Sequence, residues 1–279
     1  KAKQFKTISL IKFGLPIAIF YLLINLIGSI DLFFIKALTP LALSDLFSGY
    51  YSAASTIAKI PFLLFNAILF VIFPLVSSTT SSNDLEKAKY YISNAMRYSL
   101  LFVTPLVVLI SAMAPNLISL IYSDKYLSAS AALQVLSFGI GFFCLFIVLC
   151  IIIQASNNPR LAVIFGAITV ALDIILNMIL VPQYSLLGAA LATTISLFLG
   201  MTLAGAYVYF KFKTMLAIKS FIRIFIAGII LYAIAMLFPF TGILLVAEGI
   251  ILVALYVAIL FALRELKEKD FNVLLKMVK

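Results

Sequence analysis

The feature that most constrains the fold is a series of eight apolar stretches, each long enough to cross a bilayer as a helix. A hydrocarbon core of ~30 Å takes roughly 20 helical residues at about 1.5 Å rise per residue. The stretches far exceed a barrel strand and show no inward–outward alternation. We therefore expect an all-α, polytopic transmembrane helix bundle. The expected spans are 10–37, 49–76, 98–114, 131–154, 161–180, 186–210, 220–238 and 243–263.

Basic residues fall almost entirely on one side of this layout. Seventeen of the 20 Lys and Arg residues lie in links and span ends on the side of the N-terminus, whereas the opposite links hold only Lys125. Cytoplasmic links carry such an excess, so we expect a multi-pass protein of the cytoplasmic membrane with both ends of this segment in the cytoplasm. The topology and the anionic membrane lipids then explain the net charge of +10, and we expect membrane lipids rather than nucleic acid as partners. The two exceptions, Lys36 and Lys59, fall within spans.

The second span carries a stripe of polar residues at helical spacing. A Lys near the middle of a span is costly in lipid, so Lys59 needs a partner or a water-filled groove. Two interpretations stay open: Lys59 meets an anion such as a phosphate in a polar groove, or it pairs with a buried carboxylate. Pro61 predicts a bend here, either as a gate or as a static kink. The stripe consists of Ser48, Ser52, Ser55, Lys59 and Asn66.

The first span holds another polar face and a separate acid. Lys36 lies near the outer end of the span, where it either joins the groove or extends its ammonium to the membrane surface. Asp31 falls on a different face, deep in the span. The polar face consists of Tyr21, Asn25, Ser29 and Lys36, of which Asn25 and Lys36 are candidates for substrate contact.

The fifth and sixth spans add polar residues that suit a small cation. Asp173 and Asn177 are one turn apart on one face, and Thr193 lies beside the small residues 188–190 of the next span. Carboxylate, amide and hydroxyl oxygens are ligands for Na⁺-like ions, and a buried Asp can instead carry a proton. Interhelical hydrogen bonding is the alternative role for these residues.

Neither catalysis nor a cofactor finds support in the sequence. Cys144 and Cys150 lie on different faces of the fourth span, which is typical of small buried hydrophobes, and the chain has no His. The outer links offer only Asp45 and Asp124 as acids, too few for a membrane glycosyltransferase or ligase. We expect a protein that is not an enzyme, with no cofactor and no metal beyond a possible Na⁺.

Six short stretches carry a family resemblance when they are taken in order. They are 73–78 (FPLVSS), 84–88 (DLEKA), 116–122 (NLISLIY), 134–137 (QVLS), 177–182 (NMILVP) and 187–194 (LGAALATT). Together they resemble the C-terminal lobe of the polysaccharide (oligosaccharide-lipid) flippases. These belong to the multidrug/oligosaccharidyl-lipid/polysaccharide exporter (MOP) superfamily, which also holds the lipid II flippase. The resemblance covers essentially the whole chain, as spans seven to fourteen of a fourteen-span member.

The resemblance implies two six-helix lobes around a central cavity and alternating access by rocking of the lobes. The polar stripe of the second span would line that cavity, with Lys59 as a phosphate contact. A sodium site in the lipid II flippase branch uses an acid of the lobe's first helix, a polar pair of the fifth and a Thr of the sixth. The matching positions here are Asp31, Asp173, Asn177 and Thr193.

We therefore expect half of a flippase that translocates lipid-linked oligosaccharide by alternating access, driven by Na⁺, H⁺ or the membrane potential. Residues 1–210 would form the six-helix lobe, and 211–279 two further helices with a cytoplasmic tail. The chain begins Lys-Ala-Lys-Gln without Met, so a first lobe is expected on the same or another polypeptide. The alternatives are a drug or cation exporter of the same superfamily, a membrane glycosyltransferase or ligase, and a non-transporting structural subunit.

Overall fold

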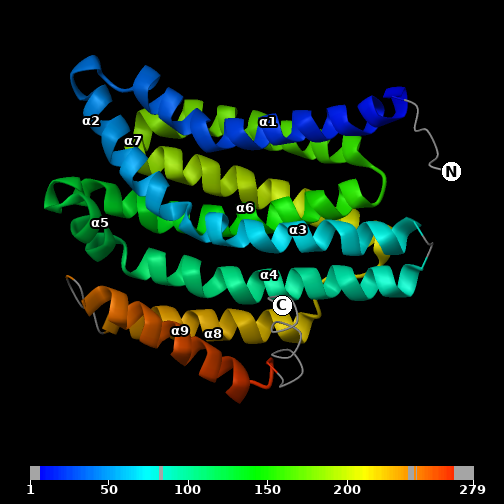
Figure 1. The fold of residues 1–279 in the computed structure, drawn as a ribbon. Helices are drawn as coiled ribbons and strands as arrows, with labels where there is room; N and C mark the ends of the chain where they lie inside the picture. Colours follow the sequence, from blue (N-terminus) through cyan, green and yellow to red (C-terminus); the bar gives the residue numbers. More distant parts are fainter. Residues whose placement is uncertain (1–6, 82–83, 238–241, 243, 267–279) are drawn as a thin grey trace.

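The computed structural model describes residues 7–81, 84–237, 242 and 244–266, which form helices and short links without any strand. This confirms the predicted all-α membrane bundle (Figure 1). The helices are α1 (Thr7–Leu38), α2 (Leu41–Ala58), α3 (Ile60–Ser81), α4 (Leu85–Ala112), α5 (Ala114–Tyr122), the 3₁₀ helix η1 (Asp124–Ala129), α6 (Ser130–Ala155), α7 (Pro159–Phe212), α8 (Ile218–Leu237) and α9 (Leu244–Ala262).

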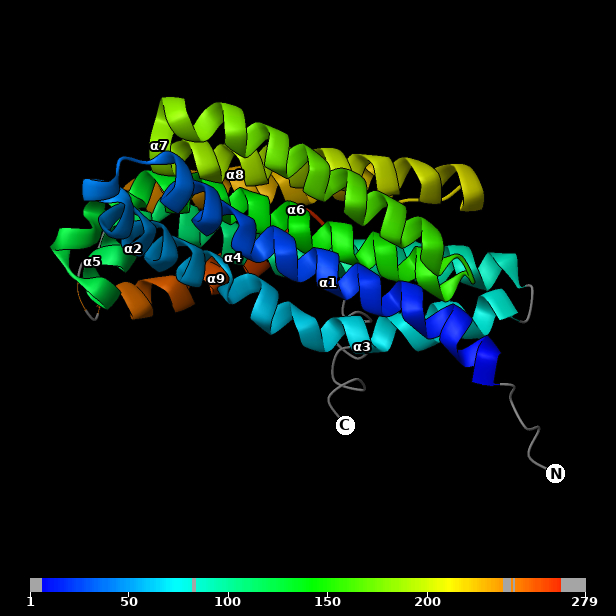
Figure 2. The ribbon, with the colours of Figure 1, turned by 90° about the horizontal axis from the view of Figure 1, so that it is seen from above.

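Seven of the eight predicted spans correspond to uninterrupted helical segments. Within the described residues, six helices are long and apolar enough to cross a membrane, and one of them, α7, contains two spans. The chain reverses inside α7 at Ser185 (φ 50°, ψ −121°), which gives the predicted hairpin of the fifth and sixth spans (Figure 2). The reversal requires Gly188, because a Cβ there would stand 2.1 Å from the carbonyl oxygen of Leu180.

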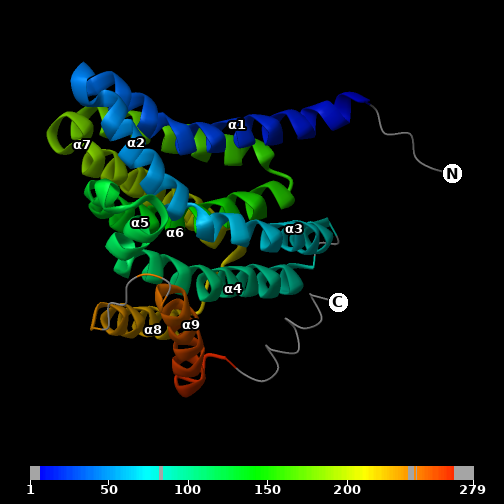
Figure 3. The ribbon, with the colours of Figure 1, turned by 60° about the vertical axis from the view of Figure 1, so that its left-hand side comes forward.

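The second span is the exception, because it is broken into α2 and α3 at Lys59. Pro61 explains the break: its ring nitrogen has no hydrogen to donate, and the ring collides with the carbonyl four residues earlier. Figures 1 and 3 show α2 running obliquely into the bundle, after which α3 turns to run beside α4. The predicted bend at Pro61 is thus present, and the polar stripe from Ser48 to Asn66 is divided between α2 and α3.

Two clusters of buried apolar side chains hold the bundle together. The larger cluster includes residues from all the helices from α1 through α7. Helix α6 lies at its centre, with nearly every residue of its second half buried. The smaller cluster fixes α8 and α9 to α4 through Val108, Leu109 and Met113. The predicted division into 1–210 and 211–279 stays a prediction, and much of the second part lies outside the described residues.

Helix α4 begins well before the predicted third span. It starts at Leu85, whereas the apolar stretch begins at residue 98. Asp84 is the N-cap, and its side chain accepts a hydrogen bond of 3.1 Å from the backbone nitrogen of Lys87. Hydrogen bonds with Lys87 lower the pKa of the Asp84 carboxyl, which favours the charged cap. The helix thus continues from the polar link straight into the membrane-spanning region.

Candidate cation and substrate sites

Six polar side chains meet in a buried cluster between α1, α2 and α7. Asp31 comes from α1 and Tyr51 from α2, whereas the other four come from the two arms of α7 on either side of Ser185. The structure therefore brings together all four residues that were predicted to bind a cation. We call this set the buried acidic cluster. Its members, each at most 5% exposed, are Asp31, Tyr51, Asp173, Asn177, Thr193 and Ser196.

Asp31 is the centre of the cluster and accepts hydrogen bonds from three side chains of α2 and α7. Its Oδ2 accepts from the Tyr51 hydroxyl at 2.5 Å and from the Thr193 hydroxyl at 2.6 Å. Its Oδ1 accepts from the Asn177 amide at 3.0 Å. The Thr193 hydroxyl has a second acceptor within reach, the carbonyl oxygen of Ala189 at 3.2 Å. Thr193 can therefore turn its hydrogen away and present its oxygen to a ligand.

Asp173 is held less completely than Asp31. Its Oδ1 accepts from the Ser196 hydroxyl at 3.1 Å and from the Asn177 amide at 3.3 Å. Its Oδ2 is buried without a hydrogen-bond partner, and so is Oδ1 of Asn177. Buried polar atoms are nearly always satisfied in native proteins, so two unsatisfied oxygens in one cluster require a physical explanation.

The negative charge of the cluster also requires a physical explanation. Two carboxylates reach the same amide nitrogen of Asn177, at 3.0 and 3.3 Å, and the cluster contains no cationic side chain. Placing two like charges together in a buried site is unfavourable unless a proton or a cation neutralises them. The atoms that the cluster offers a ligand are carboxylate, amide and hydroxyl oxygens, the kind that Na⁺ prefers.

Lys59 lies at the break between α2 and α3 and reaches back to α1. Its ammonium donates a hydrogen bond of 2.9 Å to the carbonyl oxygen of Gly28. It forms no ion pair with a carboxylate in the part of the chain that the structure describes, which disagrees with the buried ion pair considered from the sequence. The ammonium has three hydrogens to donate, and the side chain is only half-buried. Lys59 can therefore contact an anion beside α1 and α2.

The predicted polar faces are only partly continued around Lys59. Ser52 on α2 and Asn25 on α1 are exposed, whereas Ser55 is buried and Asn66 on α3 is half-buried. Asn25 donates to the carbonyl oxygen of Tyr21 at 2.8 Å, so its amide oxygen stays available. An exposed polar surface thus follows α1 and α2. Its members are Tyr21, Asn25, Ser29, Ser52, Thr56 and Lys59, and we call this set the α1–α2 polar surface.

Lys36 lies apart from Lys59, at the other end of the exposed face of α1. Its ammonium forms a 3.2 Å ion pair with Asp45 of α2, and both side chains are exposed. Its predicted contact with substrate stays a prediction.

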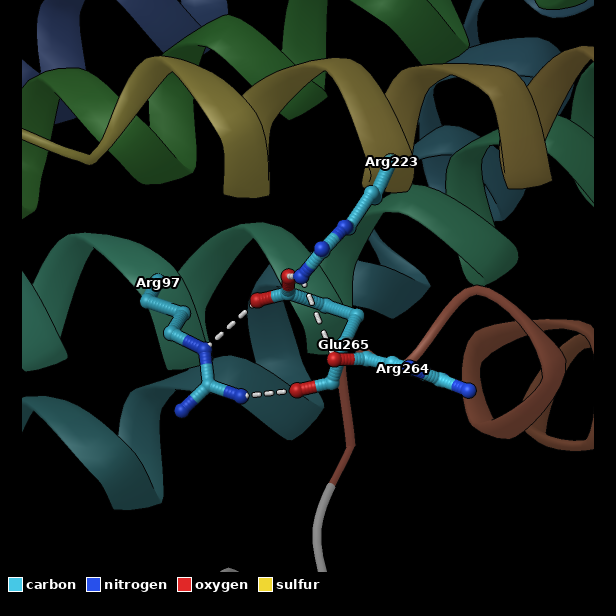
Figure 4. Close-up of polar contacts among 4 residues, drawn as sticks. All are labelled: Arg97, Arg223, Arg264 and Glu265. Carbon is cyan, nitrogen blue, oxygen red and sulfur yellow. Dashed lines mark hydrogen bonds and ion pairs between the residues drawn. The ribbon is translucent and has the colours of Figure 1, made fainter.

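A second charged cluster joins α4, α8 and the segment after α9 (Figure 4). Glu265 accepts from Nε of Arg97 at 2.7 Å and from Arg223 at 3.3 Å, and its carboxylate is almost fully buried. Arg97 also donates to the backbone carbonyl of Glu265, and Arg223 donates to that of Arg264 at 3.1 Å. We call these residues the Glu265 bridge; they attach α8 and α9 to the lobe.

Comparison with known families identifies the fold and its class. A model of the lipid II flippase MurJ family matches residues 17–262, which is most of the chain. The chain belongs to the MurJ family. The finding also places it in the MOP superfamily of flippases and transporters, as the resemblance implies. A relative of known sequence, the uncharacterized membrane protein MJ1068 of Methanocaldococcus jannaschii, is 36% identical over 72 residues, which are 26% of this chain and 14% of that protein.

Three solved transporters share the fold of this MurJ-family chain. The lipid II flippase MurJ in an inward closed conformation has a TM-score of 0.64 at 22% identity, over 86% of this chain. An outward-facing multidrug resistance MATE transporter has 0.59 at 16%, and a MOP superfamily transporter from Pyrococcus furiosus has 0.52 at 16%, each over 80%. The chain matches 52% of the length of each of these proteins.

Two members of the buried acidic cluster were not predicted for this MurJ-family chain. Tyr51 lies between Ser48 and Ser55 in the polar stripe, and Ser196 follows Thr193 by one helical turn. Spacing from a known polar residue was the one signal that could have found them, because residues three or four apart share a helical face. Tyrosine and serine are common in membrane helices as ordinary packing residues, so their type alone gave no indication.

Proposed function

We propose that this chain is the C-terminal half of a flippase that moves a lipid-linked oligosaccharide across the cytoplasmic membrane, with a cation bound in the buried acidic cluster. The family match supports a membrane flippase of the MOP superfamily. The substrate, the coupling ion, the orientation and the missing first lobe belong to the proposal. The excess of basic residues on one side supports placing both ends of the segment in the cytoplasm.

The observation that carries the cation proposal is the pair of unsatisfied buried oxygens, Oδ2 of Asp173 and Oδ1 of Asn177. A cation would take these oxygens together with the free lone pair of Asp31 Oδ1 and the Thr193 oxygen. A bound Na⁺ would offset one of the two negative charges, and it would be a common ligand of α1 and the two arms of α7. A proton on one carboxylate would offset the same charge, so Na⁺ and H⁺ are the two candidates.

The α1–α2 polar surface supports an anionic substrate. Lys59 is its one cationic member, and the surface includes no acidic residue. A phosphate of a lipid-linked sugar would meet the Lys59 ammonium and hydroxyls such as that of Ser52. The apolar helices around this surface would leave the lipid tail in the membrane. Since transport needs a cavity between two lobes, the partner that completes the site is a first lobe on the same or another chain.

A drug or cation exporter is the second candidate, and the likeness to a multidrug resistance MATE transporter favours it. A cationic drug would need acidic groups facing the cavity. The described acids of α1 and α7, Asp31 and Asp173, are instead buried, and both accept a hydrogen bond from the Asn177 amide. The positive charge of Lys59 on the exposed surface therefore favours the anionic, sugar-phosphate substrate. We also propose that the chain has no enzymatic activity, because its family consists of lipid flippases.

Translocation by the full-length protein in proteoliposomes tests the substrate proposal. We expect Lys59→Ala to reduce flipping of a lipid-linked oligosaccharide about tenfold or more, because a charge-assisted contact is lost. Lys125→Ala, which removes an exposed lysine of the outer link, is the matched control and should flip normally. Undiminished flipping by a correctly inserted Lys59→Ala protein would contradict the proposed contact. Export of a cationic dye without any flipping would favour the drug exporter.

The ion is tested by imposing Na⁺, K⁺ and pH gradients separately. We expect flipping to depend on the Na⁺ or the H⁺ gradient, and Asp173→Asn to abolish that dependence. Asp45→Asn, at the exposed Lys36 ion pair, is the control and should retain it. Equal rates under all gradients in the unmodified protein would contradict cation coupling.

A further inference from the structure

We propose that Tyr51 is a positioning residue that couples occupancy of the buried acidic cluster to the position of α2, and thereby to Lys59. This inference rests on the proposed cation site. It concerns a residue that lies on α2, outside the four predicted cation ligands.

Besides the exposed Lys36–Asp45 ion pair near its start, helix α2 is bonded to α1 at two points. Near its middle, the Tyr51 hydroxyl donates to Oδ2 of Asp31 at 2.5 Å. At its end, the Lys59 ammonium donates to the carbonyl oxygen of Gly28 at 2.9 Å. Gly28 and Asp31 are one turn apart on α1, and Tyr51 and Lys59 are about two turns apart along α2. The same short section of α1 thus holds both the cation site and the anion contact.

Both attachments depend on the charge of Asp31. A hydrogen bond to an ionised carboxylate is roughly twice as strong as one to a neutral acceptor. The Lys59 ammonium binds the carbonyl oxygen of Gly28, one helical turn before Asp31, so its charge lies on the same section of α1 as the carboxylate. A cation or a proton at Asp31 would weaken the Tyr51 hydrogen bond and reduce the attraction of Lys59 at the same time. Occupancy of the cluster therefore loosens α2 from α1 at both points.

Helix α2 is a short element bounded by Pro40 and by the kink at Lys59. At that kink, helical hydrogen bonds still run from Lys59 to Ser55 and from Leu63 to Lys59. Its exposed residues Ser52 and Thr56 belong to the α1–α2 polar surface, so a shift of α2 would move that surface together with Lys59. Tyr51 is the buried residue of α2 that bonds directly to the acidic cluster, and it supplies the link between the two sites.

A thiol-labelling experiment on the full-length protein tests this role. Thr56→Cys provides an exposed reporter on α2, the native Cys144 and Cys150 are buried, and any other accessible cysteine is replaced by Ser. We expect Na⁺, or acid if the proton is the ligand, to increase the labelling rate by about threefold or more over a K⁺ buffer at neutral pH. Adding Tyr51→Phe should raise the rate without cation to the occupied level and abolish the response.

Tyr50→Phe is the matched control, because the Tyr50 ring packs on Tyr126 at the outer end and makes no bond to the cluster. Cation binding is measured in parallel as the cation-dependent rise in melting temperature, and Tyr51→Phe should retain it. If Tyr51→Phe binds the cation and its labelling responds like that of Tyr50→Phe, the coupling role is wrong and the cation site stands. If Tyr50→Phe shows neither cation binding nor a labelling response to Na⁺ or acid, both the cation site and the coupling role fall.

Discussion

The buried acidic cluster and the Glu265 bridge both bury carboxylates within the same helical bundle, yet their surroundings are opposite. Glu265 faces two guanidinium groups, and both of its oxygens accept hydrogen bonds from them. Asp31 and Asp173 face hydroxyls and one shared amide, and Oδ2 of Asp173 accepts no hydrogen bond. The donors in the bridge are permanently charged, whereas the donors in the acidic cluster are neutral. Burial alone therefore does not distinguish the two kinds of carboxylate; the hydrogen-bond acceptors left unsatisfied do.

The largest effect is expected at the bridge. Glu265→Gln leaves Arg97 and Arg223 without their carboxylate, and breaking a buried ion pair is strongly destabilising. Because the arginines are partly exposed, we expect a loss of about 2–3 kcal/mol in the free energy of unfolding. Denaturation in mixed micelles measures it. Glu86→Gln, which removes an exposed ion pair of α4, is the control, and an equal, negligible change in both variants would contradict a structural role for the bridge.

The same acid-to-amide change should act in the opposite sense in the acidic cluster. Asp173→Asn removes one of two like charges, so we expect unchanged or higher stability in the absence of Na⁺ or acid. The variant should also lose the cation-dependent stabilisation, which is about 2.7 kcal/mol at a ligand concentration 100 times Kd. Melting curves at constant ionic strength, with Na⁺ replaced by K⁺, measure both quantities. A variant as destabilised as Glu265→Gln, with its cation response intact, would remove the distinction between the two clusters.

A smaller effect is expected from Thr193→Val, which keeps the side-chain shape and removes one ligand oxygen. Cation affinity should fall about tenfold, because one of several oxygen contacts is lost and the carboxylates remain. Titration of the melting temperature with Na⁺ gives the apparent affinity. Thr202→Val, an exposed Thr on the same arm of α7, is the control. An unchanged affinity would show that Thr193 only joins helices.

The smallest effect is expected at the exposed ion pair between Lys36 and Asp45. Lys36→Ala should change the free energy of unfolding by no more than about 0.5 kcal/mol, because solvent screens the pair and both side chains lose rotational freedom in forming it. The same denaturation measurement applies. A loss as large as that from Glu265→Gln would mean that exposure is a poor guide to the strength of these pairs.

The fold followed from the sequence because apolar length is the dominant requirement of a membrane span. The sequence also indicated the polar residues of the first, fifth and sixth spans. A carboxylate or amide in lipid is costly unless it has a hydrogen-bond partner, a ligand or access to water. The family resemblance then singled out Asp31, Asp173, Asn177 and Thr193 as one set. Helical periodicity by itself assigns each residue to a face of its own helix and says nothing about which faces meet.

Two features could not be predicted for that reason, although Pro61 did predict the bend beside Lys59. Tyr51 joins the acidic cluster because α2 packs against α1 and α7 there. Arg97 and Glu265 are 168 residues apart, and neither residue carries a local pattern that points to the other.

The early start of α4 gives the protein a helical extension beyond the predicted span. The helix is continuous from Leu85 to Ala112, so about 20 Å of it precedes the predicted span. If the lobe rocks, the N-terminal end of α4 at Leu85 moves with it. A small change in the angle of the lobe then produces a displacement at that end that a pair of spectroscopic labels can resolve. The capped first turn at Asp84 is thus a natural attachment point from which to follow the transport cycle without touching either site.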